Sequence, residues 1–401
     1  MSKFTSTLLI LGICSSSLSV FAQTYAVGHT SITFKDPNRS NRSIPCEIYY
    51  PATSAGDNSP ISSDRKFPCI AFGHGFVMTW DAYKNVWNTL VPQGFVVAFP
   101  KTEGTASPSH SQFGSDLAFV LSAMKSEGSN SSSLFYNQVD SMNCVMGHSM
   151  GGGAAFLAAS KSNQVKFIAT LAAAETNPSA IKAAASLTIP SLVLAAGNDC
   201  VTPPKDHQIP LYDSLKSNCK TFVSITGGSH CQMAEDNFLC NFGEATCSPK
   251  PSITRGEQHQ IQFQFLIPWL RYHLLQDAAA ANIFDSLVGK SKAVETRKNC
   301  QLQPMNNSNE RILIQYKGIS IYPNPASNKI HITFKNIEQS AEIQLLSFNG
   351  KLLYDWKVDN NSNADITLNI PSEIARGIYL FRVKINNETT NHRILIDPAG
   401  K

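Results

Sequence analysis

The 401-residue sequence is low in charge and lacks several patterns that would define its class. Charged residues make up 15% of the chain, and 33 Lys and Arg nearly balance 29 Asp and Glu. Because there is no basic cluster, nucleic acid is not expected as a partner. No apolar run reaches the ~20 residues that a helix needs to cross a bilayer, so we expect no integral membrane segment. Paired CxxC motifs are also missing, and we expect no metal site.

The N-terminal segment has the layout of a secretory signal peptide over residues 1–22. Lys3 precedes an apolar run over residues 8–13, and small residues follow as far as Ala22. A lipoprotein anchor at Cys14 is the alternative, but the bulky residue before Cys14 disfavours that processing. We therefore expect cleavage after Ala22 and an exported protein.

Export changes how the cysteines are interpreted. The sequence contains ten cysteines, and nine remain once the signal peptide is removed. In an oxidising compartment such residues form disulfides more often than they bind metal. Since nine is odd, at least one thiol stays free, and Cys144 is the candidate because it lies inside an apolar strand pattern. The sequence leaves the pairing open, but the cysteine-rich segment 231–247 is expected to be stapled by disulfides.

Residues 23–277 alternate short apolar runs with helix-like segments. Runs that are apolar throughout indicate parallel strands covered on both faces. We therefore predict an α/β domain with a doubly wound, mostly parallel sheet, preceded by an antiparallel pair over 25–34 and 44–50. A final helix is expected over 258–275, bent by Pro268. The other predicted strands cover residues 69–72, 95–99, 144–146, 165–171, 192–195 and 222–225, with helices at 82–90, 116–124 and 154–160.

The chain changes character after residue 277. Residues 278–289 could extend a helix, but the residues after them are polar and have no periodic apolar face. We interpret 278–315 as a linker. From 316 to 401, alternating strand patterns are separated by turn signals such as Asn349-Gly350. This pattern predicts a small β-sandwich.

A GxSxG segment, Gly147 to Gly151, lies between a predicted strand and a predicted helix. This context is typical of a nucleophile elbow, a tight turn whose glycines avoid collisions with neighbouring backbone. Ser149 would then sit at the helix N-terminus, where N–H groups and the helix dipole favour negative charge. A chance GxSxG in a glycine-rich loop is the alternative, but the strand and helix on either side favour the elbow. We predict Ser149 as a nucleophile.

A serine nucleophile needs a base and an acid further along the chain. Asp199 and His230 each follow the end of a predicted strand, where the active sites of open α/β sheets gather. We predict that His230 takes the Ser149 proton and that Asp199 orients the imidazole. The alternatives are Asp206 as the acid and His148 or His207 as the base.

The transition state of acyl transfer needs two hydrogen-bond donors for its oxyanion. We assign them to the backbone N–H groups of Met150, after the nucleophile, and of Phe76, in the loop that follows strand 69–72. The side chains of Phe76, Met78, Trp80 and Tyr83 are predicted to line an acyl groove. For Trp80 and Tyr83 the alternative is packing against the following helix.

Together these residues resemble the cutinase, polyester-hydrolase and chlorophyllase branch of the α/β-hydrolases over residues 24–275. The resemblance is carried by Gly75-Phe76, the glycine-rich elbow 147–153, Asp199 and Gly228-Ser229-His230. It implies hydrolysis of carboxylic esters without a cofactor. In one departure, residues 171–176 lack the Trp that polyester hydrolases generally carry there. The short connection from 171 to 192 also predicts an open site with no cap domain.

Three motifs mark the C-terminal unit: Tyr322-Pro323-Asn324-Pro325, Asn349-Gly350-Lys351 and Arg376-Gly377-Ile378-Tyr379. With them, this unit resembles the type A sorting domain of the type IX secretion system of Bacteroidota. The resemblance implies the type IX machinery as a partner, export across the outer membrane and removal of the domain. A carbohydrate-binding sandwich is the alternative.

We therefore expect a secreted or cell-surface serine carboxylic-ester hydrolase that acts through an acyl-enzyme. Its expected substrates are bulky, lipidic or polymeric esters, with polyethylene terephthalate among the candidates. A peptidase or a cofactor-free haloperoxidase shares the fold, although a serine peptidase usually adds a propeller or cap. A non-catalytic surface adhesin is the alternative from another class, and such proteins normally lose the serine or the histidine.

Overall fold

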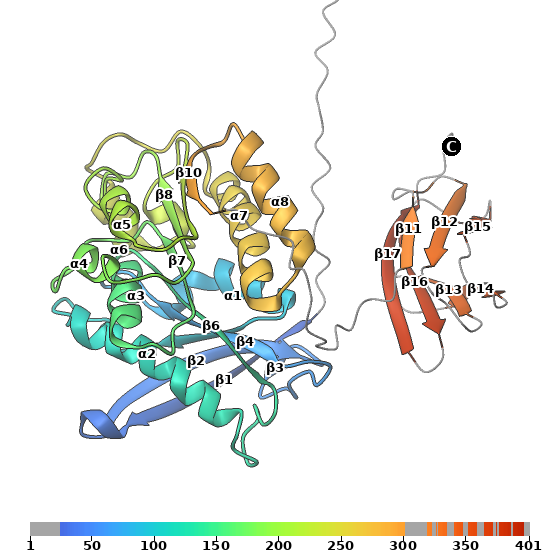
Figure 1. Cartoon of the computed structure of the whole chain (residues 1–401), viewed down its shortest axis with the longest axis horizontal. Coiled ribbons are helices and arrows are strands. Elements are labelled where there is room, and N and C mark those ends of the chain that lie inside the picture. Colours follow the sequence, from blue (N-terminus) through green and yellow to red (C-terminus); the bar gives the residue numbers. More distant parts are fainter. Residues whose placement is uncertain are drawn as a thin grey trace, which may run out of the picture. The chain divides into compact units, whose positions relative to one another are not determined.

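The structure, a computed structural model, describes residues 25–300 without a break and the strands between 319 and 396 with a few residues beside them (Figure 1). The chain divides into two compact units at Met305. Each unit is considered by itself. The predicted signal peptide, 1–22, lies outside the described residues.

A ten-stranded sheet forms the centre of the N-terminal unit (Figure 1). Its strands are β1 (Ala26–Asp36), β2 (Arg42–Ala52), β3 (Gly56–Asp57), β4 (Phe67–Gly73), β5 (Val96–Pro100), β6 (Val139–His148), β7 (Phe167–Leu171), β8 (Ser191–Ala196), β9 (Lys220–Ile225) and β10 (Val294–Asn299). They lie in the order β10-β9-β8-β7-β6-β4-β5-β2-β1-β3. The six strands from β9 to β5 run parallel, whereas β10 and β2 pair antiparallel with the two ends of this block.

Helices cover both faces of this sheet (Figure 1). They are α1 (Lys84–Leu90), α2 (His110–Glu127), α3 (Met150–Lys161), α4 (Ala180–Ala184), α5 (Gln208–Ser214), α6 (Phe238–Glu244), α7 (Arg255–Leu275) and α8 (Ala278–Lys290). One buried cluster joins the sheet to α2, α3, α4 and α5, and a second joins it to α1, α7 and α8. Burial on both faces explains why the central strands are apolar throughout. The predicted doubly wound α/β-hydrolase architecture is confirmed.

The connection from β7 to β8 contains only the five-residue helix α4. Within residues 25–300, therefore, no cap domain lies over the ends of the parallel strands. The carboxyl ends of β4, β6, β8 and β9 are the places from which the predicted catalytic residues emerge.

The predicted linker over 278–315 was wrong for its first part. Residues 278–290 form α8, whose Phe284 is fully buried. Residues 294–299 form β10, which pairs with β9 at the edge of the sheet, and Cys300 is joined to Cys219. An edge strand is held by backbone hydrogen bonds and needs no apolar run. Every second residue of β10 is exposed, so polar residues are tolerated and the sequence resembles a linker.

Helix α7 starts at Arg255 rather than at the predicted residue 258. Thr254 and Glu257 form a capping box, in which each residue's backbone N–H donates to the other's side-chain oxygen, at 2.7 and 3.2 Å. Pro268 lies inside the helix.

Six cysteines of the N-terminal unit are paired. The disulfides are Cys200–Cys247, Cys219–Cys300 and Cys231–Cys240. Cys144 is free and buried, as predicted, and Cys46 and Cys69 are free and buried too. Among the described residues, no group of three or more His, Cys, Asp or Glu side chains is placed to hold a metal ion.

The C-terminal unit consists of two small antiparallel sheets. Its strands are β11 (Ile319–Tyr322), β12 (Lys329–Phe334), β13 (Ala341–Ser347), β14 (Leu352–Val358), β15 (Asp365–Asn369), β16 (Gly377–Ile385) and β17 (Glu388–Ile396). One sheet has the order β11-β12-β15 and the other β14-β13-β16-β17. A single buried cluster takes Ile332 from the first sheet and Ile343 and Phe381 from the second. The two sheets therefore form a sandwich. The Asn349-Gly350-Lys351 motif and residues 323–325 lie outside the described residues.

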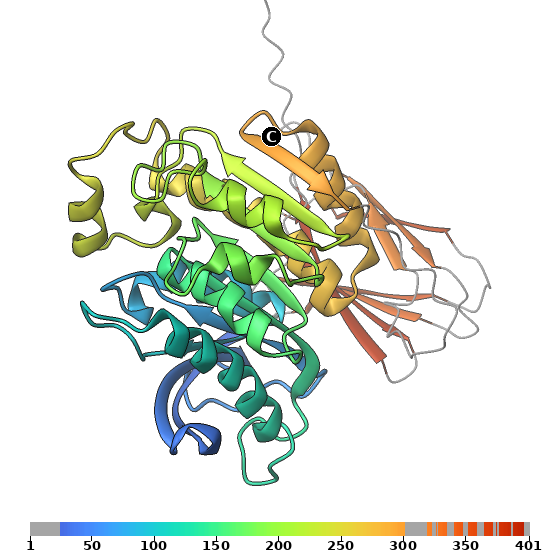
Figure 2. The same ribbon diagram turned by 60° about the vertical axis from the view of Figure 1, so that its left-hand side comes forward.

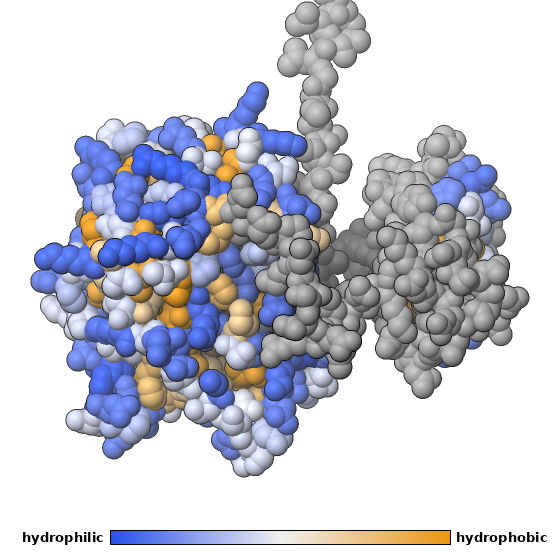
Figure 3. Space-filling view, in the orientation of Figure 1, coloured by the Kyte–Doolittle hydropathy of each residue, from blue (hydrophilic) through white to orange (hydrophobic). Residues whose placement is uncertain are grey.

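The surface of the N-terminal unit is mixed on the face drawn in Figure 3, where hydrophobic residues form patches between hydrophilic ones. This mixture is ordinary for a protein surface. Of the helices that the structure describes, none combines the length and the apolar character needed to cross a membrane.

Candidate active site

Ser149 occupies a strained turn between β6 and α3. Its φ of 56° and ψ of −121° lie outside the regions that residues with a side chain prefer. The backbone is fixed there, because its N–H donates to the Leu171 carbonyl at 3.0 Å and its carbonyl accepts from Ala174 N–H at 2.8 Å. The Ser149 side chain makes no capping hydrogen bond with α3. The hydroxyl is therefore not engaged with the helix that it precedes.

The glycines of the elbow are required by close backbone contacts. A Cβ on Gly147 would lie 2.4 Å from the carbonyl of Gly151, and one on Gly151 would lie 2.1 Å from the Gly73 oxygen. Gly73 ends β4, so the loop after β4 packs directly against the elbow. This contact brings the predicted oxyanion loop to Ser149.

Asp199 and His230 form a buried pair. His230 Nδ1 lies 2.7 Å from Asp199 Oδ2, and the two side chains are 3% and 0% exposed, respectively. The other carboxylate oxygen, Oδ1, accepts the backbone N–H groups of Val201 and Thr202 at 2.9 and 2.7 Å. These donors fix the carboxylate, which in turn fixes the imidazole.

Thr202 adds a hydroxyl to this pair that sequence reasoning missed. Its Oγ1 lies 2.9 Å from Asp199 Oδ2 and 3.0 Å from His230 Nδ1. Gln208 Nε2 donates to the same hydroxyl at 3.1 Å. The signal was present, because an Asp followed three residues later by Thr is typical of a turn in which the carboxylate accepts N–H groups just ahead of it.

The loop of His230 is held from two helices. Glu244 of α6 accepts the His230 N–H at 2.8 Å and the Ser229 hydroxyl at 3.1 Å. Gln258 of α7 makes two 2.8 Å hydrogen bonds with the Ser229 backbone. Two disulfides start next to the pair, one at Cys200 and one at Cys231. The expectation of a stapled segment over 231–247 is confirmed.

His148 bridges the elbow and the histidine loop. Its Nδ1 lies 3.0 Å from the Tyr83 hydroxyl and its Nε2 lies 3.2 Å from the His230 carbonyl. The His148 and His230 rings are 4.7 Å apart between centroids, which brings His230 beside the residue that precedes Ser149. Burial, together with the charge of His230, lowers the pKa of His148 well below its usual value. A neutral bridging imidazole is a structural element, so His148 is a poor alternative base.

The other predicted alternatives are Asp206 and His207. Asp206 is exposed, whereas His207 is half-buried and its Nδ1 accepts the N–H of Glu175 at 2.9 Å. Burial also lowers the pKa of His207. His207 therefore fits a loop-supporting role.

The loop after β4 is anchored just before Phe76. Gly75 N–H donates to the Tyr83 hydroxyl at 2.7 Å, and the two His74 ring nitrogens lie 2.9 Å from the carbonyls of Gly75 and Thr102. Phe76 follows with its side chain 49% exposed. Met150, the other predicted donor, is the first residue of α3, where a backbone N–H has no acceptor within its own helix.

The predicted acyl groove was wrong for two residues. Met78 and Tyr83 are 2% and 0% exposed, so their side chains belong to the core rather than to a surface groove. Tyr83 is buried because its hydroxyl serves Gly75 and His148. Trp80 is half-buried and its ring packs near Tyr49 and Trp87, with centroids 6.0 and 5.5 Å apart. The packing alternative therefore describes Trp80 and Tyr83, and of the four side chains Phe76 alone is exposed.

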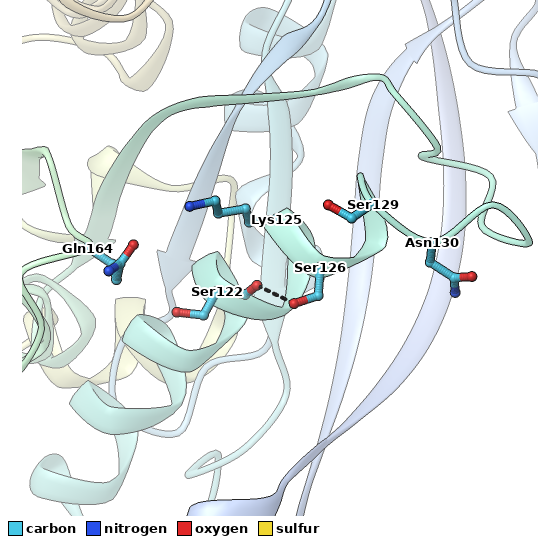
Figure 4. Close-up of a pocket in the computed structure, with 6 residues that line it drawn as sticks. All are labelled: Ser122, Lys125, Ser126, Ser129, Asn130 and Gln164. Atoms are coloured by element: carbon cyan, nitrogen blue, oxygen red, sulfur yellow. Dashed lines mark hydrogen bonds between the residues drawn. The ribbon is translucent and has the colours of Figure 1, made fainter.

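A polar depression lies at the C-terminal end of α2 (Figure 4). It is lined by the last turns of α2 and by Gln164, which follows α3. The carboxyl ends of these helices lie at the sheet edge opposite to the carboxyl ends of the parallel strands. Its lining residues are Ser122, Lys125, Ser126, Ser129, Asn130 and Gln164.

Comparison with known proteins places the chain in a family. The family model described as PET hydrolase-like matches residues 20–245, which is more than half of the chain, and the secretion system C-terminal sorting domain model matches residues 320–397. Cutinase est1 of Thermobifida alba is 27% identical over 185 residues, covering 46% of this chain and 56% of the relative.

Two further relatives are of similar distance. A cutinase of Thermobifida fusca (strain YX) is 28% identical over 185 residues, covering 46% of this chain and 56% of the relative. The bis(hydroxyethyl) terephthalate hydrolase of Streptomyces coelicolor is 28% identical over 197 residues, covering 46% and 54%. The chain thus spans little more than half the length of these relatives. On the family match, the chain belongs to the PET hydrolase-like family, with a secretion sorting domain at its C-terminal end.

Proposed function

We propose that the protein is a serine hydrolase of carboxylic esters with Ser149, His230 and Asp199 as its catalytic triad. The observation that carries the proposal is the buried 2.7 Å contact between His230 Nδ1 and Asp199 Oδ2. It fixes the orientation of an imidazole whose ring lies 4.7 Å, between centroids, from that of His148, the residue before Ser149. Buried and paired in this way, the imidazole can present its other nitrogen, Nε2, as a base.

The reaction begins when His230 Nε2 takes the proton of Ser149 Oγ as that oxygen attacks the ester carbonyl. Asp199 stabilises the imidazolium that forms. The tetrahedral intermediate collapses as His230 gives the proton to the leaving alcohol. Water activated by the same nitrogen then hydrolyses the acyl-enzyme and restores Ser149.

The N–H groups of Met150 and Phe76 are the proposed oxyanion donors. The N-terminus of α3 supplies the first donor and a favourable dipole. The anchoring of Gly75 by Tyr83 supports the second, because it fixes the backbone one residue before Phe76. Loss of one such donor typically costs about 3–4 kcal/mol of transition-state stabilisation.

The substrate class is bulky, lipidic or polymeric esters. The relatives include cutinases and a bis(hydroxyethyl) terephthalate hydrolase, and residues 25–300 contribute no cap that would exclude a large ester. Polyethylene terephthalate is a candidate within this class. Residues 171–176 bring no aromatic side chain to the site, so binding of an aromatic ester would depend on Phe76.

The protein is proposed to be secreted or displayed at the cell surface by the type IX secretion machinery. The match of residues 320–397 to the sorting domain model and the sandwich of β11–β17 support this route. Removal of residues 1–22 precedes it. The sorting unit would act as an address and take no part in ester chemistry.

Hydrolysis of p-nitrophenyl butyrate by the full chain tests the proposal. Ser149→Ala is expected to lower kcat by roughly 10⁵-fold or more, since a triad acts as a unit. Ser141→Ala, a change at an exposed serine of β6, the strand that precedes Ser149, should leave the rate unaltered. A folded wild-type protein without activity, or an active Ser149→Ala variant, would contradict the proposal and favour a peptidase or an adhesin.

A further inference from the structure

Helix α6 exposes three large apolar side chains. Phe238, Leu239 and Phe242 are 79%, 51% and 71% exposed, and no other described segment of this unit gathers three exposed large hydrophobic residues. The two phenylalanine rings stack, with centroids 6.3 Å apart and planes 26° apart. An ordered apolar surface of this kind on a small helix points to a binding role.

The opposite side of α6 is anchored to the catalytic loop. Cys240 is bonded to Cys231, the residue after His230, and Glu244 accepts the N–H of His230 at 2.8 Å. Asn241 is tied to Asp236 and Arg255 by side-chain hydrogen bonds. The helix is therefore attached to the residues that hold the proposed general base.

Helical spacing separates the two sides. At 100° per residue, positions 238, 242, 239 and 243 span one continuous arc, and positions 240, 244 and 241 span the other. The first arc carries the exposed side chains, and a Cβ built on Gly243 would meet no atom within 4 Å. Glu244 is the one charged residue of the helix, and it faces the loop. The outer arc is thus apolar and uncharged, and Figure 2 shows α6 standing out from the rest of the unit.

We propose that the outer arc of α6, formed by Phe238, Leu239 and Phe242, docks the protein on the apolar surface of a solid polyester. The proposal rests on the proposed ester hydrolase function and assigns a surface to its polymeric substrate. A small soluble ester is covered by the site around Ser149 alone. Only an extended substrate can reach Ser149 and a surface on α6 at once. The Cys231–Cys240 disulfide and the Glu244 hydrogen bond to His230 fix α6 to the loop of the proposed base.

The test uses the full chain with Phe238, Leu239 and Phe242 all changed to Ser. Binding to a polycaprolactone film is measured by depletion from solution, alongside film hydrolysis and hydrolysis of soluble p-nitrophenyl butyrate. We expect film adsorption and film hydrolysis to fall tenfold or more. The three substitutions remove most of the apolar area that the outer arc of α6 could bury against the film. Soluble turnover should stay within about twofold, since the anchoring arc is retained.

A matched control is Tyr136→Ser, which removes an aromatic ring 44% exposed on the loop between α2 and β6. This variant should adsorb like the wild type. Ser149→Ala should also adsorb like the wild type while hydrolysing nothing, so docking and catalysis fail separately. Equal melting temperatures show that the variants are folded.

Three outcomes would overturn the docking proposal. The triple variant could adsorb to the film as well as the wild type. It could lose binding to phosphatidylcholine vesicles while keeping film binding, which would assign the surface to lipid. It could change a wild-type dimer to a monomer without altering film adsorption, which would assign the surface to a second copy of the chain.

Discussion

At the scale of single residues, the site depends on how side chains around the triad fix its geometry. Asp199 receives three hydrogen bonds besides its contact with His230, two from backbone N–H groups and one from the Thr202 hydroxyl. The carboxylate is therefore positioned by neutral donors in a buried place. Thr202 contacts both the acid and the base through its hydroxyl.

Thr202→Val tests this positioning role. The change removes the hydroxyl at nearly constant volume and leaves Gln208 Nε2 without that acceptor. Loss of one such hydrogen bond corresponds to about 1 kcal/mol, so kcat/KM for p-nitrophenyl butyrate should fall roughly five- to tenfold. The pH dependence of kcat/KM should also change in the same variant.

Thr202→Ser is the matched control, because it keeps the hydroxyl and should restore both the rate and the pH profile. If Thr202→Val lowered the melting temperature but left kcat/KM and the pH profile as in the wild type, the residue would be purely structural.

The positions of Ser149, Asp199 and His230 after the ends of strands could be predicted, because each lies in or next to a glycine-containing turn that is visible as a local pattern in the sequence. The burial of Met78 and Tyr83 could not be predicted. An apolar side chain near an active site suits a substrate groove and the core equally well, and the sequence does not show which of the two it faces. The Tyr83 hydroxyl is buried where it bonds Gly75 and also His148, and the second partner is distant in sequence.

At the scale of elements, α7 carries a buried histidine that couples stability to pH. His273 lies against Phe167 and Trp269, with ring centroids 4.9 and 4.4 Å apart, and its Nε2 has no partner among the described residues. Burial lowers the pKa of His273 to about 3. The imidazole is thus neutral in the fold over most of the acid range.

The sign of the effect follows from proton binding. In the unfolded chain His273 titrates near 6.5, so between about pH 6.5 and 3 the unfolded state holds a proton that the folded state lacks. The free energy of unfolding is highest above pH 6.5 and falls as the pH decreases, by about 1.4 kcal/mol per unit from this group. Burial lowers the pKa of His148 and His74 as well, which adds slope of the same sign.

Urea unfolding of the wild type and of His273→Leu between pH 6.5 and 4.5 measures this slope. The variant should lose less stability per pH unit, by up to about 1.4 kcal/mol. Parallel curves for the two proteins would contradict the assignment of that slope to His273.

The central strands and α2, α3 and α7 could be predicted because apolar runs and helical periods report burial. The edge strand β10 was missed for a physical reason. β10 is an edge strand held in place by its pairing with β9 and by the Cys219–Cys300 disulfide. Neither contact produces a local pattern in the sequence of residues 294–299.

At the scale of the whole molecule, two units share one chain with different tasks. The first belongs to the PET hydrolase-like family and carries every proposed catalytic residue, and the second matches a secretion sorting domain. Composition shifts and strand patterns were sufficient to predict both units. The placement of the disulfides around Asp199 and His230 required the fold, since nine cysteines allow many pairings.

The central claim is that Ser149 is the nucleophile. Treatment of the full chain with diethyl p-nitrophenyl phosphate, followed by intact mass and peptide mapping, tests it most directly. We predict one diethylphosphoryl group per chain, located on Ser149, with loss of ester hydrolysis in proportion to labelling and no labelling of Ser149→Ala. Full labelling at another residue, or complete activity with Ser149 modified, would contradict the account.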